Sequence, residues 1–189
     1  MAASAGTSHS AAIGKDGALF LWGIGTFAPP TRVAGLCAPV RQVAVGHRTF
    51  GYPVGGVTGI VTDAGDLFFC GCGLNGRLGL GDRINRMAPT LVARALFDGE
   101  AVLMVAFGLY HTAVLAEGGG VYSFGRGDRG QLGPGDEDQL APRRVPAAGF
   151  HDEPDRDGGH GRGAHGDSDR GGARVYLGRW RGRSAGARR

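Results

Sequence analysis

The chain has 189 residues, 38 of them glycine, and a formal net charge of +4 at pH 7. Glycine lies far above its usual share of roughly 7% but follows no collagen period, so we expect it to mark the turns of many short strands. No run of about 18 apolar residues and no secretory signal pattern is present, so we expect neither a membrane span nor a membrane partner.

The first predicted unit lies near the N-terminus. Gly6-x-x-His9 precedes an apolar run at residues 10–13, the turn Lys15-Asp16-Gly17 and a second run, Leu19–Gly23, which ends in Trp22-Gly23. Short β-branched or aromatic runs bounded by glycine turns are typical of β-hairpins. The pattern therefore predicts two antiparallel strands.

The middle unit repeats this hairpin with changes. Strands are expected at residues 59–61 and 67–71, joined by the turn Asp63-Ala64-Gly65. Val57 stands where the repeat histidine is expected, and the preceding HRTFGYPVGG, residues 47–56, has the character of an insertion. The histidine contact is therefore not expected in this unit.

The third unit, within residues 102–133, is the best preserved. It contains Gly108-x-x-His111 and predicted strands at residues 112–115 and 121–124, joined by a turn at residues 116–119. The segment GRGDRGQLGPGD from Gly125 matches GCGLNGRLGLGD from Gly71 at every glycine. The units recur about every fifty residues, which is a period of repeat architectures.

These motifs closely resemble the repeats of the regulator of chromosome condensation family. The resemblance covers roughly residues 1–150 and implies an all-β partial β-propeller of four-stranded antiparallel blades, whereas the family normally closes a ring of seven. We place an incomplete array of about three repeats in residues 1–154. The first unit lacks Gly-x-Leu-Gly and runs into residues 26–30, so we expect a shortened blade there. Pro89 and Pro142 lie where the family usually has a proline.

The residues that define the repeat are interpreted as structural. They are Gly6, His9, Trp22, Gly23, Gly71, Gly76, Leu78, Gly79, Gly108, His111, Gly125, Gly130, Leu132 and Gly133. The histidines are expected to make a recurrent hydrogen bond within the blade, with a catalytic base or metal ligand as the alternative. Trp22, Phe69 and Phe124 are expected to pack between blades, with ligand stacking as the alternative.

No catalytic, cofactor-binding or metal-binding residues are predicted. GCGLNG and GRGDRG both fit the dinucleotide pattern Gly-x-Gly-x-x-Gly, but no helix pattern follows either, so turn glycines explain them better. No Ser-His-Asp set or carboxylate pair lies within a repeat. Three cysteines without zinc-type spacing indicate reduced thiols, and hence a nuclear or cytoplasmic protein.

Residues 155–189 form a Gly/Arg-rich low-complexity tail whose composition predicts disorder. The tail begins where a fourth repeat is due, and reading codons for residues 157–178 from their second base can give MVATGAEHTATLTEGGRVYTWG, which aligns without a gap to residues 104–125. We interpret the tail as a repeat translated out of frame. The alternative is a genuine basic arm, the only case in which nucleic-acid binding is expected. Sequencing the transcript across residue 154 distinguishes them.

The sequence thus favours a non-enzymatic scaffold that binds protein partners through loops on a propeller face. The resemblance implies two alternatives: a guanine-nucleotide exchange factor for a Ran-like small GTPase, or a substrate-binding module of a ubiquitin ligase. The expected partner is accordingly a protein, of the small-GTPase or ubiquitin-pathway class, and no cofactor is expected.

Overall fold

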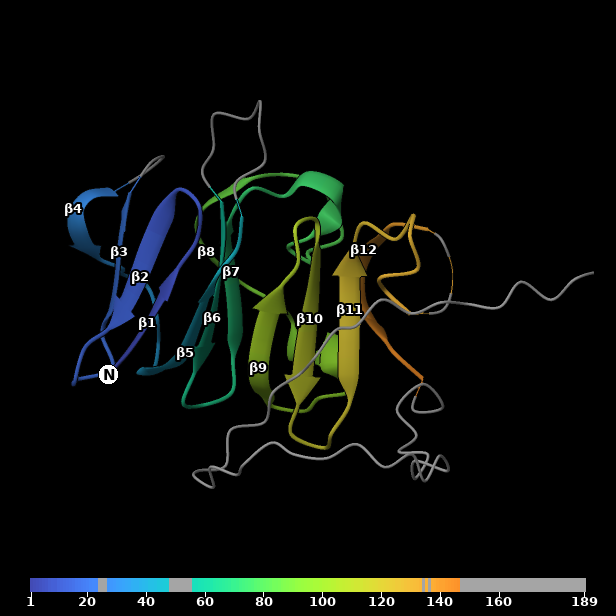
Figure 1. Cartoon of the computed structure of the whole chain (residues 1–189). Helices are drawn as coiled ribbons and strands as arrows, with labels where there is room; N and C mark the ends of the chain where they lie inside the picture. The colour runs from blue at the N-terminus through green and yellow to red at the C-terminus, as the bar shows by residue number, and fades with distance from the viewer. Residues whose placement is uncertain (24–26, 48–55, 134, 136, 147–189) are drawn as a thin grey trace, which may run out of the picture. The chain divides into compact units, whose positions relative to one another are not determined.

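A computed structural model describes residues 1–23, 27–47, 56–133, 135 and 137–146, and the described part forms one compact unit. It contains three four-stranded sheets side by side, which we call blades A, B and C (Figure 1). Their strands are β1 (Ala2–Ala5), β2 (His9–Ile13), β3 (Leu19–Gly23) and β4 (Phe27–Arg32) in A, β5 (Val40–Val45), β6 (Val57–Thr62), β7 (Leu67–Gly71) and β8 (Arg86–Leu91) in B, and β9 (Val102–Phe107), β10 (His111–Ala116), β11 (Val121–Gly125) and β12 (Gln139–Arg144) in C.

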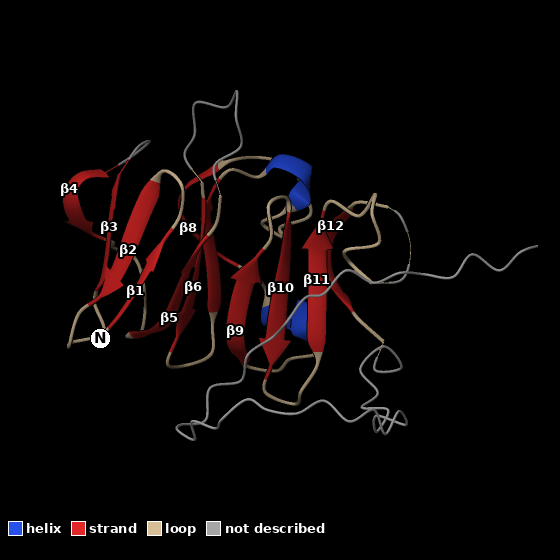
Figure 2. Cartoon of the chain, viewed as in Figure 1, coloured by secondary structure: helices blue, strands red, loops and turns tan. Residues whose placement is uncertain are grey.

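Each blade is a simple antiparallel meander in which sequential strands pair. The prediction of an all-β partial propeller with four-stranded blades is therefore confirmed. The two predicted hairpin strands of every repeat are the second and third strands of its blade, and their bounds differ from the prediction by a few residues. Figure 2 shows that strands dominate the described part, with two short 3₁₀ helices at Leu74–Gly76 and Arg94–Phe97.

The core of the described part lies between blades. Side chains on a strand alternate between its two faces, so blade B can pack against blade A with one face and against blade C with the other. The junction of blades A and B is filled by Ala11, Ile13, Leu19, Leu21, Val40, Val43, Ile60, Phe68 and Cys70. The junction of blades B and C is filled by Val57, Val61, Leu67, Phe69, Leu78, Val92, Phe97, Val102, Val105, Val114, Ala116, Tyr122 and Phe124.

A backbone hydrogen bond repeats at both junctions. The N–H of Val40 in blade B donates to the carbonyl of Gly17 in blade A at 2.9 Å, and the N–H of Val102 in blade C donates to the carbonyl of Gly65 in blade B at 2.9 Å. A β-carbon on Gly17 would lie 2.4 Å from Cβ of Pro39, and one on Gly65 would lie 2.5 Å from Cβ of Ala101. The glycine in the turn between the second and third strands of a blade thus allows the following blade to approach closely.

Blade A has four strands although it lacks the Gly-x-Leu-Gly segment, and its β3 and β4 are separated only by residues 24–26. The shortening expected from the sequence therefore falls on a connection and removes no strand. Residues 147–189, which include the predicted boundary at 154 and the Gly/Arg-rich tail, lie outside the described residues.

Candidate protein-interaction face

The connections within the blades lie at two opposite ends. The connections from first to second strand and from third to fourth strand share one end, because neighbouring strands are antiparallel (Figure 1). We call this end the loop face. It includes the long connections 72–85 in blade B and 126–138 in blade C, whereas the other end has short turns such as 63–66 and 117–120. Loops on a rigid scaffold commonly carry binding residues.

The Gly-x-x-His motif closes a tight connection on the loop face. The N–H of Gly6 donates to the carbonyl of His9 at 3.0 Å, and the N–H of Gly108 donates to the carbonyl of His111 at 2.9 Å. The motif therefore marks the point where the first strand of a blade turns into the second.

Blade B makes the same closing bond without the histidine. The N–H of Gly46 donates to the carbonyl of Val57 at 2.8 Å. The segment interpreted as an insertion lies between these two residues, and its residues 48–55 are outside the described part of the chain. The insertion is thus placed in the first connection of blade B.

The strand-end glycines adopt a backbone conformation that other residues rarely take. Gly23, Gly71 and Gly125 have φ values of +123°, +107° and +106°. They pair with His9, Val57 and His111 in the strand register. A β-carbon on Gly71 would lie 2.2 Å from the carbonyl oxygen of Gly56. These positions need glycine both for φ and for the close approach of the facing strand.

His9 links two blades rather than two strands of one blade. Its Nε2 lies 2.7 Å from the hydroxyl oxygen of Thr58 on β6, which is 2% exposed. The contact therefore joins blade A to blade B, whereas the sequence predicted a hydrogen bond within the blade. His111 has the same register position in blade C, where it pairs with Gly125.

Burial affects the charge of both histidines. Desolvation lowers the pKa of His9 and of His111 below 6.5, because the partly buried site disfavours the imidazolium form. A neutral ring suits His9, since one ring nitrogen then serves as donor or acceptor toward Thr58. The arrangement thus favours a structural contact over a cationic site.

We expect the stability of the protein to fall as the pH drops through 6.5. The unfolded imidazoles take up protons there while the folded ones, with lowered pKa values, do not, so stability is full above 6.5 and is lost toward the lower folded pKa. Chemical denaturation between about pH 7.5 and pH 5.5 measures this. The His9→Gln, His111→Gln double variant should show a shallower decline; a decline identical to that of the wild type would contradict the assignment.

The Gly-x-Leu-Gly segments pack Leu78 and Leu132 into buried positions, 1% and 5% exposed. In blade B the segment lies against blade C: a β-carbon on Gly76 would lie 2.6 Å from Leu140, and one on Gly79 would lie 2.7 Å from the Phe124 ring. In blade C the same positions are open: nothing lies within 4 Å of a β-carbon on Gly130, and only Val145 approaches Gly133. Both segments follow a strand through tight turns, with no α-helix next to either glycine pattern.

Two of the three motif aromatics meet at the junction of blades B and C. Phe69 and Phe124 are fully buried, with ring centroids 5.8 Å apart in a T-shaped arrangement. Such edge-to-face pairs contribute about 0.5–1.5 kcal/mol beyond their buried area. Trp22 is half-buried and belongs to neither core cluster, so the structure does not bring it to these rings.

The structure reveals a cluster on the loop face that the sequence motifs did not indicate. The guanidinium of Arg126 lies 5.3 Å from the centroid of the Tyr110 ring, and its Nε donates to Asp128 Oδ1 at 2.8 Å. The backbone N–H of Arg126 also donates to the carbonyl of Tyr110 at 3.0 Å. We call Tyr110, Arg126 and Asp128 the Tyr-Arg-Asp cluster. Its signal was present in GRGDRG as an Arg-x-Asp pair that no glycine turn requires.

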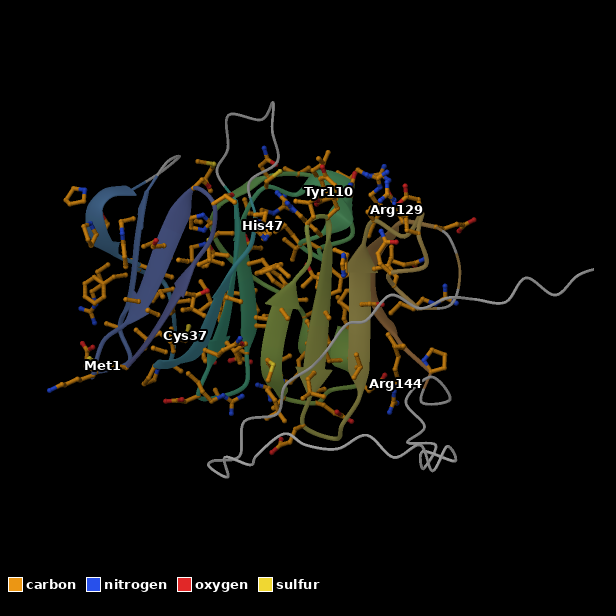
Figure 3. All side chains as sticks on the ribbon, viewed as in Figure 1. Met1, Cys37, His47, Tyr110, Arg129 and Arg144 are labelled. Atoms are coloured by element: carbon orange, nitrogen blue, oxygen red, sulfur yellow. The ribbon has the colours of Figure 1, made fainter. Side chains whose placement is uncertain are left out.

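Exposed apolar and charged side chains surround this cluster. Leu109 is 49% exposed and Ile84 62% exposed, while Arg83 and Asp138 form an ion pair at 3.3 Å between blades B and C. Figure 3 shows Tyr110, Arg129 and His47 at the loop face and Arg144 at the other end. Tyrosine and arginine beside apolar groups are enriched where proteins bind one another.

The described residues include no group of three His, Cys, Asp or Glu side chains placed to hold a metal ion. No helix in the same part of the chain is long and apolar enough to cross a membrane.

Comparison with known proteins gives a consistent result. The sequence model of the regulator of chromosome condensation (RCC1) repeat matches residues 64–115, and a second model of the same repeat matches residues 105–131. The chain is 38% identical over 156 residues to the probable E3 ubiquitin-protein ligase HERC3 of Homo sapiens. This alignment covers 75% of this chain and 14% of HERC3. It is 32% identical over 154 residues to the mitochondrial RCC1 domain-containing protein RUG3 of Arabidopsis thaliana, covering 76% of this chain and 33% of RUG3.

Among solved structures, Prp20p of Saccharomyces cerevisiae superposes with a TM-score of 0.61 and 22% identity, covering 77% of this chain and 38% of Prp20p. That structure is described together with the binding of Prp20p to Gsp1p and histones. At this identity the likeness concerns the fold alone. The chain spans between about a seventh and two fifths of these proteins.

Proposed function

Because the chain contains regulator of chromosome condensation repeats, we propose that it is a non-enzymatic scaffold that binds a protein partner through its loop face. The observation that carries this proposal is the Tyr-Arg-Asp cluster. Arg126 is stacked on Tyr110 and paired with Asp128, so the guanidinium is held in place before any partner arrives. Preorganised side chains lose little freedom on binding, which favours affinity.

The surroundings of the cluster suit a protein surface. Leu109 and Ile84 supply exposed apolar area, and Arg129 and the Arg83–Asp138 pair supply charge of both signs. Protein interfaces commonly combine an apolar centre with a polar rim. An aromatic and arginine centre among charged residues therefore supports recognition of a folded protein.

Exchange activity on a Ran-like small GTPase is the second candidate. The likeness in fold to Prp20p, whose structure is described with Gsp1p binding, favours it. A nucleotide-release assay tests it directly: acceleration of release by this chain would establish exchange, and none at high protein concentration would leave scaffold binding alone. HERC3 is named as a probable E3 ubiquitin-protein ligase. This relative supports a third proposal, that the chain is a substrate-binding module in ubiquitin transfer.

We expect Tyr110→Ala with Arg126→Ala to weaken binding to the partner by about 30-fold or more, since truncation of a single hot-spot residue already costs about 2 kcal/mol. Affinity purification with the wild type identifies the binding protein, and titration of that protein measures the loss. Arg144→Ala is the matched control, because Arg144 is exposed at the opposite end. Equal binding by the loop-face variant and the control would overturn the proposed face.

The compartment is part of the same proposal. Nucleus or cytoplasm fits reduced cysteines, and the described cysteines are free, with Cys70 and Cys72 buried. RUG3, by contrast, is named as mitochondrial. Fluorescence localisation of the full chain decides, and a mitochondrial signal would overturn the nuclear or cytoplasmic assignment.

A further inference from the structure

Blade B lacks the histidine that joins blade A to the next blade. Val57 has the register position of His9, since each pairs with the strand-end glycine of its blade. In blade A the His9 ring reaches Thr58 of the following blade. A valine offers no such bond, and Val57 is 1% exposed within the core of the next junction. Away from the loop face, Arg41 and Gln42 of β5 already bond the backbone of β9 at Val102 and Val105. At the loop face, the place of the histidine in blade B is open to another polar group.

A buried arginine lies at that junction. Arg77 is 1% exposed and is the largest of the fully buried side chains described. Its Nε donates to the carbonyl of Cys72 at 2.9 Å, and its Nη1 donates to the carbonyls of Leu109 at 3.1 Å and His47 at 3.3 Å. These carbonyls belong to three different connections of the loop face. Arg77 thus joins blade B, the start of its inserted connection, and blade C.

Thr58, which bonds the His9 ring in blade B, has a counterpart in blade C. Thr112 has the register position of Thr58, and it is 0% exposed. Its hydroxyl donates to the backbone carbonyl of Arg77 at 2.7 Å. The segment around Arg77 therefore meets the same threonine position that His9 meets at the preceding junction.

The geometry of the site suits arginine, whose Nε and Nη1 make the three bonds while its Nη2 is buried without a hydrogen-bond partner. The planar guanidinium directs several donors apart in a fixed fork, so it can reach carbonyls on separate connections, which an ammonium on a flexible stem does poorly. Hydrogen bonds from a charged donor are stronger than neutral ones, and their loss leaves buried carbonyls without partners. The equivalent position in blade C is Gln131, whose side chain stays within its own connection, accepting from Arg129 N–H at 2.8 Å.

We propose that Arg77 takes the place of the missing repeat histidine of blade B and ties the loop-face end of blade C to blade B and to the backbone at His47. This inference concerns the junction and goes beyond the proposed function, because it holds whichever partner binds. The two buried cysteines supply separate reporters. Cys70 lies in the core between blades A and B, whereas the carbonyl of Cys72 is itself a partner of Arg77.

The test is thiol labelling of the native full chain with one cysteine retained. With Cys37→Ser and Cys70→Ala, only Cys72 reports; with Cys37→Ser and Cys72→Ala, only Cys70 reports. We expect Arg77→Gln to raise the labelling rate of Cys72 by about tenfold or more, which corresponds to one charged hydrogen bond, and to leave Cys70 unchanged. Adding Val57→His to Arg77→Gln should return part of the protection, because the histidine can then reach Thr112.

Arg83→Gln is the matched control. It removes an arginine from the same connection whose ion pair with Asp138 also spans blades B and C. That side chain is 57% exposed, and exposed ion pairs contribute little, so it should change neither rate. If Arg77→Gln yields too little folded protein, Arg77→Lys provides the same comparison with a smaller rise at Cys72. An unchanged Cys72 rate, an equal rise at Cys70 and Cys72, or no protection from Val57→His would each overturn the proposal.

Discussion

Replacing Phe69 by alanine is expected to lower the free energy of unfolding by about 3–5 kcal/mol. Phe69 is 0% exposed, and its ring makes T-shaped contacts with Phe107 and Phe124 at centroid distances of 5.9 and 5.8 Å. Truncation removes both contacts and leaves a cavity that the surrounding strands cannot fill. The loss is a large part of the roughly 5–15 kcal/mol by which folded domains are usually stable. Urea unfolding followed by circular dichroism measures it.

Phe20→Ala is the matched control for this prediction. Phe20 has the same side chain but is half-buried in blade A and belongs to neither junction cluster. We expect its truncation to cost about 1 kcal/mol, near the centre of the range for point variants. Equal losses for the two variants would show that the junction of blades B and C does not dominate stability.

The strand pattern was predictable because it is a local property of the sequence. Apolar runs bounded by glycine turns fix both hairpin strands in each repeat, and the glycines of the matched segments fix their register. The structure confirms the four-stranded blades on this basis. The first and fourth strands of a blade gave weaker sequence signals. The first strand can consist of small side chains, as in residues 2–5, and the fourth strand contains proline.

The contacts between blades were not predictable from the same patterns. His9 reaches Thr58 across 49 positions of sequence, and Arg77 reaches Leu109 across 32. Whether an arginine in a glycine-rich segment is exposed or buried depends on how closely the next blade approaches. Arg83, a few residues on, is mostly exposed while Arg77 is fully buried. Only the packed arrangement distinguishes them.

The Tyr-Arg-Asp cluster illustrates the same limit at the candidate site. Tyr110 occupies a variable position of the Gly-x-x-His motif, between Gly108 and His111. Arg126 directly follows the strand-end glycine Gly125. The register of β10 with β11 brings the two connections together, because His111 pairs with Gly125. The motif residues His111 and Gly125 thus position the proposed binding residues.

Replacing Gly71 by alanine is expected to lower the free energy of unfolding by about 3 kcal/mol or more, since a left-handed backbone costs an L-residue about 1–2 kcal/mol and a steric overlap adds to it. The φ of Gly71 is +107°, and a β-carbon would lie 2.2 Å from the carbonyl oxygen of Gly56 and 3.0 Å from Cα of Val57. Both are backbone atoms, so relief requires β6 and β7 to separate.

Gly81→Ala isolates the steric part of this cost. Gly81 also has positive φ, +84°, but nothing lies within 4 Å of its β-carbon position. We expect a loss of about 1–2 kcal/mol there, from backbone strain alone. The difference between the two variants, measured by urea unfolding, is then the cost of pushing apart the strands that the strand-end glycine allows to meet. If the two losses were equal, conformation alone would explain why the position is glycine, and the close approach of β6 to β7 would have no energetic part in it.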